Sequence, residues 1–195
     1  MTVLRIGAGA GYAGDRIDPA QDLVERGALD ALVFECLAER TIALAQLRRR
    51  HDPAAGYDLL LEDRMRAVLP ARHTQGFTIL TNMGAANPRA AGEAVLRVAR
   101  ALGLPRLRVA VVTGDDVLPW VQSHAVPLLD APGTAADLGD RLVSANAYLG
   151  AEALLPALQA GADVVVTGRV ADPALFLAPL MHRFGWRPDD WHRLG

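Results

Sequence analysis

The sequence predicts an α/β protein with an open, mostly parallel sheet and helices on both faces, layered as in a Rossmann fold. Short apolar runs recur near residues 3, 29, 77, 107 and 162. Each run is followed by a helix start signal, and strands that alternate with helices pair in parallel through right-handed crossovers. Each run also ends in a polar or glycine-rich loop. We therefore expect a ligand site at the carboxyl edge of the strands.

The composition is that of a folded protein of ordinary domain size. The 195 residues are 51% hydrophobic and 22% charged, which suits a single α/β domain over residues 1–195. The net charge of −2 provides no basic field, so we do not expect nucleic acid as a partner. There is no leader-like segment, no membrane-length apolar run and only one cysteine. A cytoplasmic protein without a membrane partner is expected.

The first predicted strand, residues 3–6, runs into a glycine-rich segment that we expect to form a loop from Gly7 onward. Gly9, Gly11 and Gly14 have the G-x-G-x-x-G spacing, at which bare backbone amides approach an anion. Glu35 closes the next apolar run about 20 residues later, as a ribose-binding carboxylate would. A nucleotide or other anion site and a sharp turn without any ligand both remain open.

Helix start signals place the first helices. Asp18 is the predicted N-cap of the first helix, with Pro19 as its first residue, and three residues separate this cap from the last glycine. Asn87 and Pro88 repeat the same signal. The elements expected in this half are a strand at 28–34, a helix capped near Thr41, a helix at 57–73, a strand at 77–81 and a helix at 89–102.

The second half continues the alternation less regularly. A strand is expected at 107–112, followed by an irregular stretch at 118–133. Residues 137–159 are predicted to form a long helix with kinks at Gly150 and Pro156. A fifth strand at 162–166 and a helix at 174–184 complete the pattern.

Carboxylates follow several of the predicted strands. Because parallel strands end at one edge of a sheet, these groups are expected to converge as general acids and bases or as oxygen ligands of a divalent cation. No spacing is diagnostic of a metal, and internal ion pairs that fix the loops explain the same residues. The candidates for catalysis are Asp15, Glu35, Asp115 and Asp116.

Arg169 is the candidate for holding a carboxylate or phosphate, because its planar guanidinium binds such groups through two hydrogen bonds. We expect it close enough to Asp15, Glu35 or Asp115 to depress their pKa values, in a cleft floored by Gly9 and Gly11. Anchoring of a loop is the alternative role. The candidates for ligand binding are Gly9, Gly11, Gly14, Asn82, Asn87, Thr113, Gly114, Thr167, Gly168 and Arg169.

The remaining reactive side chains give weaker signals. Cys36 follows a buried strand and has no histidine partner at a fixed spacing, so we interpret it as a small buried hydrophobe rather than a nucleophile. The five histidines show no metal-ligand spacing, and only His124 is kept as a candidate for proton transfer. Metal binding is not predicted, and the sequence leaves the cofactor open.

Five segments together resemble one known family. They are Gly9–Ala20, Phe34–Thr41, Thr81–Pro88, Thr113–Asp116 and Thr167–Asp172. These segments resemble the acyclic terpene utilisation (AtuA-type) family, and the resemblance covers essentially the whole chain. Members of that family extend beyond this length, so the chain resembles an N-terminal part. An exposed apolar surface is therefore expected around Trp186 and Trp191.

The resemblance implies a role in bacterial degradation of citronellol and geraniol, whose intermediates are coenzyme A thioesters. An enzyme of acyl-CoA or small-carboxylate catabolism with lyase or hydratase chemistry is one hypothesis. A noncatalytic ligand-binding or assembly subunit, as a homo-oligomer or in association with an acyl-CoA carboxylase, is another. A nucleotide-binding module is the third.

Overall fold

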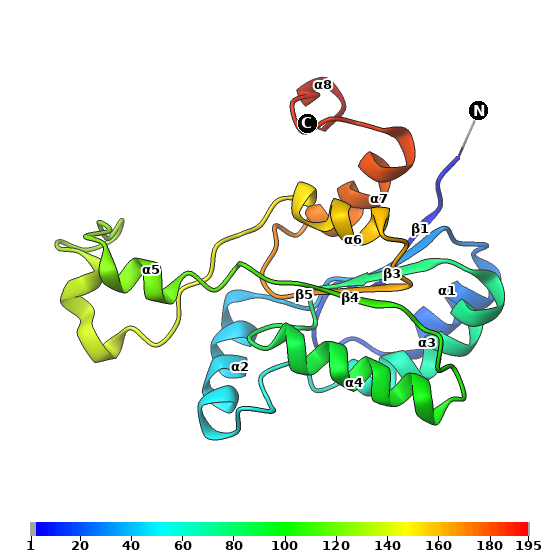
Figure 1. Cartoon of the computed structure of the whole chain (residues 1–195), viewed down its shortest axis with the longest axis horizontal. Coiled ribbons are helices and arrows are strands. Elements are labelled where there is room, and N and C mark those ends of the chain that lie inside the picture. Colours follow the sequence, from blue (N-terminus) through cyan, green and yellow to red (C-terminus); the bar gives the residue numbers. More distant parts are fainter. Residues whose placement is uncertain (1–2, 195) are drawn as a thin grey trace.

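Five parallel strands form one open sheet in the computed structural model, which describes residues 3–194 (Figure 1). The strand order is β1-β2-β3-β5-β4, and every neighbouring pair is parallel. The strands are β1 (Ile6–Ala10), β2 (Ala31–Phe34), β3 (Thr78–Thr81), β4 (Val109–Val112) and β5 (Val164–Thr167). The predicted fold class is confirmed, and β2 to β5 lie within three residues of their expected positions, whereas β1 shares only Ile6 with the strand expected at 3–6.

Helices cover both faces of the sheet (Figure 1). One face packs against α1 (Asp18–Arg26), α3 (Leu61–Gln75) and α4 (Pro88–Ala101). The other packs against the short helices η2 (Ala151–Leu154) and α6 (Leu155–Gln159) and against α7 (Ala174–Phe184). A hydrophobic core lies on each face of the sheet, and the side chains of β2 alternate between the two. Leu32 and Phe34 pack into the core beside α1, α3 and α4, and Ala31 and Val33 pack into the core beside η2, α6 and α7. Helix α2 (Glu39–His51) stands at the carboxyl edge.

The glycine-rich run is part of the sheet. Gly7 and Gly9 lie within β1, so the expectation of a loop from Gly7 onward is wrong. A Cβ on Gly7 would lie 2.6 Å from Cδ2 of Leu23, and one on Gly9 would lie 2.7 Å from Cε1 of Phe34. These glycines therefore allow close packing of β1 against the Leu23 side chain of α1 and the Phe34 ring of β2.

Of the two predicted helix N-caps, one is confirmed and the other is wrong. Asn87 caps α4 as predicted, because its side chain accepts a hydrogen bond from the amide of Ala90. Asp18 is not the N-cap of α1: Ile17 holds that position and Asp18 is already helical. The Asp18 carboxylate instead pairs with Arg16.

Residues 116–150 form an arm that projects away from the sheet (Figure 1). The arm contains α5 (Leu118–Ser123) and the short helix η1 (Ala135–Arg141), and a bridge between Asp116 and Asn146 closes its base. The continuous helix predicted at 137–159 is therefore wrong, although residues 151–159 are helical as η2 and α6 and Gly150 precedes η2. Gly139 has a φ of 51° and ends the helical path, and residues 142–150 are irregular.

Helix α8 (Trp191–Leu194) is the last element described. Trp191 is 75% exposed beside a cavity lined by Leu177, Met181 and Leu194, so an apolar surface is present where one was expected. Trp186 stacks on Phe184 and packs partly against the core. No helix within residues 3–194 has both the length and the apolar character needed to cross a membrane.

Candidate functional site

Asn82 joins the loops that leave β2 and β3. Its side chain is fully buried, and its Oδ1 accepts a hydrogen bond from the Cys36 amide at 2.7 Å. Its Nδ2 donates to Oε1 of Glu35 at 2.8 Å. The predicted residues Glu35 and Asn82 are thus brought together, and they position one another.

A cavity of about 340 Å³, called the inner cavity below, opens beside this pair at the carboxyl edge. This is the size of a small-molecule site, and few polar groups interrupt its apolar wall. The polar residues among those that line it are Cys36, Thr41, Arg48, Asp58 and Asn82. The lining residues are Ala13, Gly14, Cys36, Leu37, Thr41, Leu44, Arg48, Asp58, Leu59, Leu60, Asn82, Met83 and Ala85.

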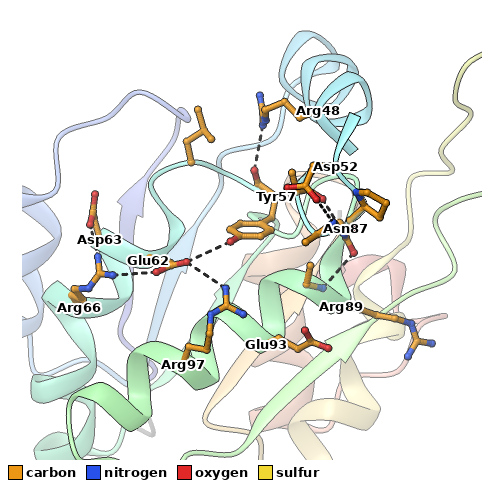
Figure 2. A pocket seen from close by; sticks show the side chains of 16 residues that line it. Arg48, Asp52, Tyr57, Glu62, Asp63, Arg66, Asn87, Arg89, Glu93 and Arg97 are labelled. Carbon is orange, nitrogen blue, oxygen red and sulfur yellow. Dashed lines mark hydrogen bonds and ion pairs between the residues drawn. The ribbon is translucent and has the colours of Figure 1, made fainter. Parts of the chain in front are cut away.

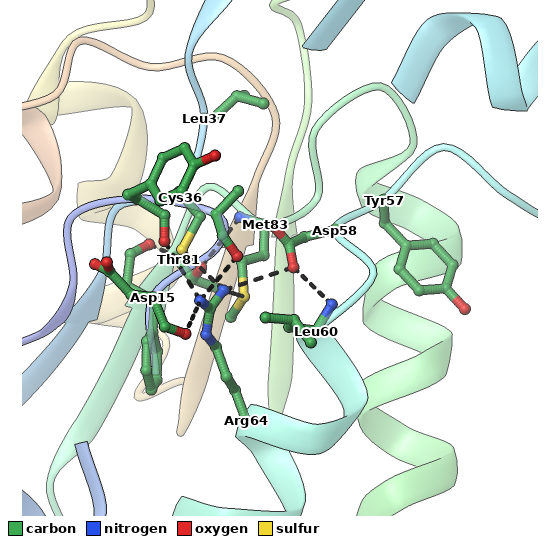
Figure 3. Close-up of polar contacts among 12 residues, drawn as sticks. Asp15, Cys36, Leu37, Tyr57, Asp58, Leu60, Arg64, Thr81 and Met83 are labelled. Atoms are coloured by element: carbon green, nitrogen blue, oxygen red, sulfur yellow. Dashed lines mark hydrogen bonds and ion pairs between the residues drawn. The ribbon is translucent and has the colours of Figure 1, made fainter. Parts of the chain in front are cut away.

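A fully buried arginine, Arg64 of α3, lies behind this wall (Figure 3). Its Nη2 donates to the backbone carbonyls of Ala13 at 3.0 Å and Asp15 at 3.1 Å, so it fixes the loop that follows β1. Its Nη1 lies 3.6 Å from Oδ1 of Asp58 and 3.1 Å from Sγ of Cys36. The guanidinium therefore connects the β1 loop to the two titratable groups of the inner cavity.

Burial changes the titration of both groups. Loss of water around the Asp58 carboxyl raises its pKa, although the Leu60 amide and Arg64 act in the opposite direction. Burial also raises the pKa of the Cys36 thiol to about 12, again against the attraction of Arg64. Cys36 is accordingly a protonated thiol at neutral pH.

Asp15 occupies the turn that follows β1. Its Oδ2 accepts a hydrogen bond from the Gly11 amide at 2.9 Å, so a carboxylate of the chain itself sits where an anionic ligand was expected. Gly14 lies under the ring of Tyr12 and lines the inner cavity. Gly9 is buried against Phe34 and does not floor a cleft as predicted. A ligand role for Gly11 and Gly14 stays a prediction.

A second group of predicted residues lies at the exits of β4 and β5. Oδ2 of Asp115 accepts hydrogen bonds from the Arg169 amide and from Nδ2 of Asn146, both at 2.9 Å. Gly168 is needed here, because a Cβ on it would lie 2.5 Å from the same carboxylate oxygen. Asn87, Thr113, Asp115 and Asp116 line a small cavity of about 110 Å³. Gly114 has a φ of +118° in this loop.

The Arg169 guanidinium does not pair with the predicted carboxylates. It donates to the Leu37 carbonyl at 2.7 Å, lies 3.7 Å from Asp172, and stacks on the Tyr148 ring at 4.6 Å. The expected depression of the Asp115 pKa is wrong, because burial raises that pKa. Arg169 anchors the Leu37 loop in this structure, and binding of a ligand by Arg169 stays a prediction.

Comparison with known proteins identifies the family. The family model for the acyclic terpene utilisation family protein AtuA matches residues 4–195. The chain belongs to the AtuA family. The search of curated proteins gave no significant match to this AtuA-family chain. The search of solved structures gave none either.

Sequence reasoning about this AtuA-family chain missed Asp58 and Arg64. Both were counted within the predicted helix at 57–73, where charged residues are normally assigned to the solvated face. Asp58 lies before α3, and Arg64 points from its first turns into the protein. The only signal was indirect: Leu61, Met65 and Leu69 place the buried face of α3 next to residue 64. Within residues 3–194, no three His, Cys, Asp or Glu side chains are grouped as a metal site requires.

A larger groove of about 670 Å³, called the outer groove below, lies between the loop after α2 and helix α4 (Figure 2). Charged side chains line its wall together with small apolar residues. Glu62 is the centre of its contacts, with Arg66 at 3.1 Å, Tyr57 at 3.4 Å and Arg97 at 3.5 Å. The charged lining residues are Arg48, Asp52, Glu62, Asp63, Arg66, Arg89, Glu93 and Arg97.

Proposed function

We propose that this AtuA-family protein acts on a branched acyl group from acyclic terpene breakdown, bound as a carboxylate or a coenzyme A thioester in the inner cavity. The observation that carries the proposal is Asp58, a buried carboxyl with a raised pKa on the wall of an apolar cavity. Leucine, methionine and alanine side chains suit a branched hydrocarbon chain. The carboxyl end of a parallel sheet is where such folds bind ligands.

Lyase or hydratase chemistry fits these groups best. In hydration of a conjugated double bond, Asp58 takes a proton from water as the water oxygen bonds to the β-carbon. Asp58 then delivers this proton to the α-carbon, so that one water is added across the double bond, and elimination is the reverse. A raised pKa brings a carboxyl closer to neutral pH, where exchange of a proton in both directions is most effective. Arg64, at 3.6 Å, holds Asp58 in place.

A noncatalytic ligand-binding subunit is the second candidate, and the state of Cys36 favours it over a thiol enzyme. The chain has one cysteine, and its pKa of about 12 leaves almost no thiolate for acyl transfer. Nucleotide binding through the glycine run is less well supported, because Gly7 and Gly9 serve the packing of β1.

The test measures binding and turnover separately. Geranic acid binding is followed by calorimetry, and hydration of geranoyl-CoA is followed by loss of the conjugated thioester absorbance. We expect Asp58→Asn to bind geranic acid normally and to lose turnover by about 10²- to 10⁴-fold. Asp130→Asn, an exposed change in the arm, is the matched control.

The outcomes separate the hypotheses. Full turnover by Asp58→Asn removes Asp58 from the mechanism, and Asp115→Asn and Arg169→Ala then test the second group of residues. Binding without turnover in the unmodified protein establishes the noncatalytic subunit. Absence of binding rejects both candidates.

A further inference from the structure

The inner cavity and the outer groove are neighbours with a common border. Arg48 and Leu59 line both of them. A ligand that extends out of the inner cavity past these two side chains therefore enters the outer groove. The two spaces have volumes of about 340 and 670 Å³, so the outer part offers the larger share of the room.

The walls of the two spaces differ in chemistry. The inner cavity is lined mostly by leucine, alanine and methionine, whereas four arginines and four carboxylates are among the residues that line the outer groove. A molecule that fills both must be apolar at one end and polar at the other, since a polar end inside would lose its water without compensation. The contrast between the walls thus also fixes the direction in which such a molecule lies.

Two features of the border are unexplained by the protein's own contacts. Nη2 of Arg48 donates to the Tyr57 carbonyl at 3.2 Å, but its Nε is buried and finds no hydrogen-bond partner among residues 3–194. Buried donors are normally paired, so this nitrogen is available to an acceptor on a ligand at the border. Leu59 is 76% exposed, and a chain lying across the border would cover it.

The outer groove is lined by four arginines and four carboxylates, and two of the arginines are weakly engaged. Two carboxylates, Glu62 and Asp63, are already engaged by Arg66 at 3.1 and 2.6 Å. Arg97 has only a long contact of 3.5 Å with Glu62, and Arg89 makes no ion pair within the described part of the chain. Arg89 and Arg97 can therefore contact an anionic group without breaking a strong pair.

From this arrangement we infer that the two spaces form one site for an amphiphile, with a branched acyl chain in the inner cavity and a longer, anionic head in the outer groove. Arg48 contacts the polar junction between the two parts. This inference rests on the proposed function and specifies its substrate class: an acyl group linked to a large anionic carrier rather than a free acid. Glu93 and Asp52 border the same groove and restrict where the anionic groups lie.

The experiment compares three probes, geranic acid, geranoyl-CoA and free coenzyme A, by calorimetry on the whole chain. We expect the thioester to bind at least about 10-fold more tightly than the acid, and the difference to shrink as salt is raised. The variant Arg89→Gln/Arg97→Gln should weaken the thioester by about 10-fold and leave the acid unchanged. Arg106→Gln, an exposed arginine near the opposite edge of the sheet, is the control.

The results distinguish this inference from the function on which it rests. The two-part site is overturned if the acid and the thioester bind with equal affinity, or if the groove variant binds the thioester as the unmodified protein does. In either case the proposed binding of the acyl group in the inner cavity is not rejected. Failure of both ligands to bind rejects the proposed function as well. Arg48→Gln provides a second test, because it should reduce the affinity for the thioester more than Arg106→Gln does.

Discussion

Gly84 lies against the backbone carbonyl of Thr167, so closely that a Cβ on Gly84 would stand 2.4 Å from that oxygen. Gly84 follows β3 and Thr167 ends β5, and these two strands are neighbours in the sheet. From β3 the chain passes to α4 on one face, and from β5 to α7 on the other. Open α/β sheets usually bind ligands at such a switch point. Here backbone packing fills it, and the inner cavity opens one strand away, between β2 and β3.

Replacement of Gly84 by alanine should therefore destabilise the protein. The added methyl group also meets Cα of Pro88 at 2.8 Å, and neither backbone segment can move aside freely. We expect a loss of about 1–3 kcal/mol in the free energy of unfolding, measured by urea titration. Gly11→Ala is the matched control, because nothing lies within 4 Å of its Cβ position. Equal stability of the two variants would contradict the close packing.

The ion pair of Arg64 and Asp58 should show strong energetic coupling. Arg64→Met leaves Asp58 as a buried charge and leaves the Ala13 and Asp15 carbonyls without their donor, at a cost of about 3–5 kcal/mol. Adding Asp58→Asn to that variant should recover part of the loss, because the unpaired charge is gone. A double-mutant cycle in urea measures the coupling. Strictly additive losses would show that the two groups do not interact.

Cys36 should be almost inert toward alkylation. With a pKa of about 12, its thiolate fraction at pH 8 is roughly 10⁻⁴, about a thousandfold below that of an ordinary cysteine. Iodoacetamide labelling followed by mass spectrometry should be slow in the native protein and fast in urea. Because the chain has one cysteine, the signal has one source. Rapid labelling at pH 8 would show that the thiol is not buried as described.

Asp115 should make folding less favourable as pH rises. Burial raises the pKa of the Asp115 carboxyl in the folded protein above the ordinary value of 3.8. The protonated carboxyl therefore stabilises the folded state fully below pH 3.8, and this stabilisation is lost as the pH rises through the raised pKa. Asp115→Asn carries no charge and should gain stability relative to the unmodified protein across the same interval. Urea titrations from pH 3.5 to 7 measure the difference. A constant difference would mean that the pKa of Asp115 is the same in both states.

The fold was predictable because strands and helix starts are local signals. Asn87 followed by Pro88 marks α4 correctly, and the apolar runs mark all five strands. The glycine run misled the prediction for a physical reason. A strand that packs under Leu23 and beside Phe34 needs glycine as much as a ligand loop does, and the sequence does not distinguish the two causes.

The site was predictable only in part, because its parts are joined by long-range contacts. Glu35 and Asn82 were correctly expected at one edge, since parallel strands end together. Arg64 was not, because periodicity treats an arginine as a surface residue. The partners of Arg169 were also wrong, since Tyr148 and Leu37 reach it from segments whose paths no local pattern specifies.

Arg64 also bears on how the protein reaches its native state. The loop after β1 has its carbonyls bound by a side chain about fifty positions later, so this loop cannot settle until α3 has docked. During synthesis, β1 and its loop are therefore made first but reach their final conformation only after α3 has been synthesised. The inner cavity, which borders that loop, therefore cannot form before α3 docks. Partial unfolding of α3 would accordingly release this loop and open the inner cavity.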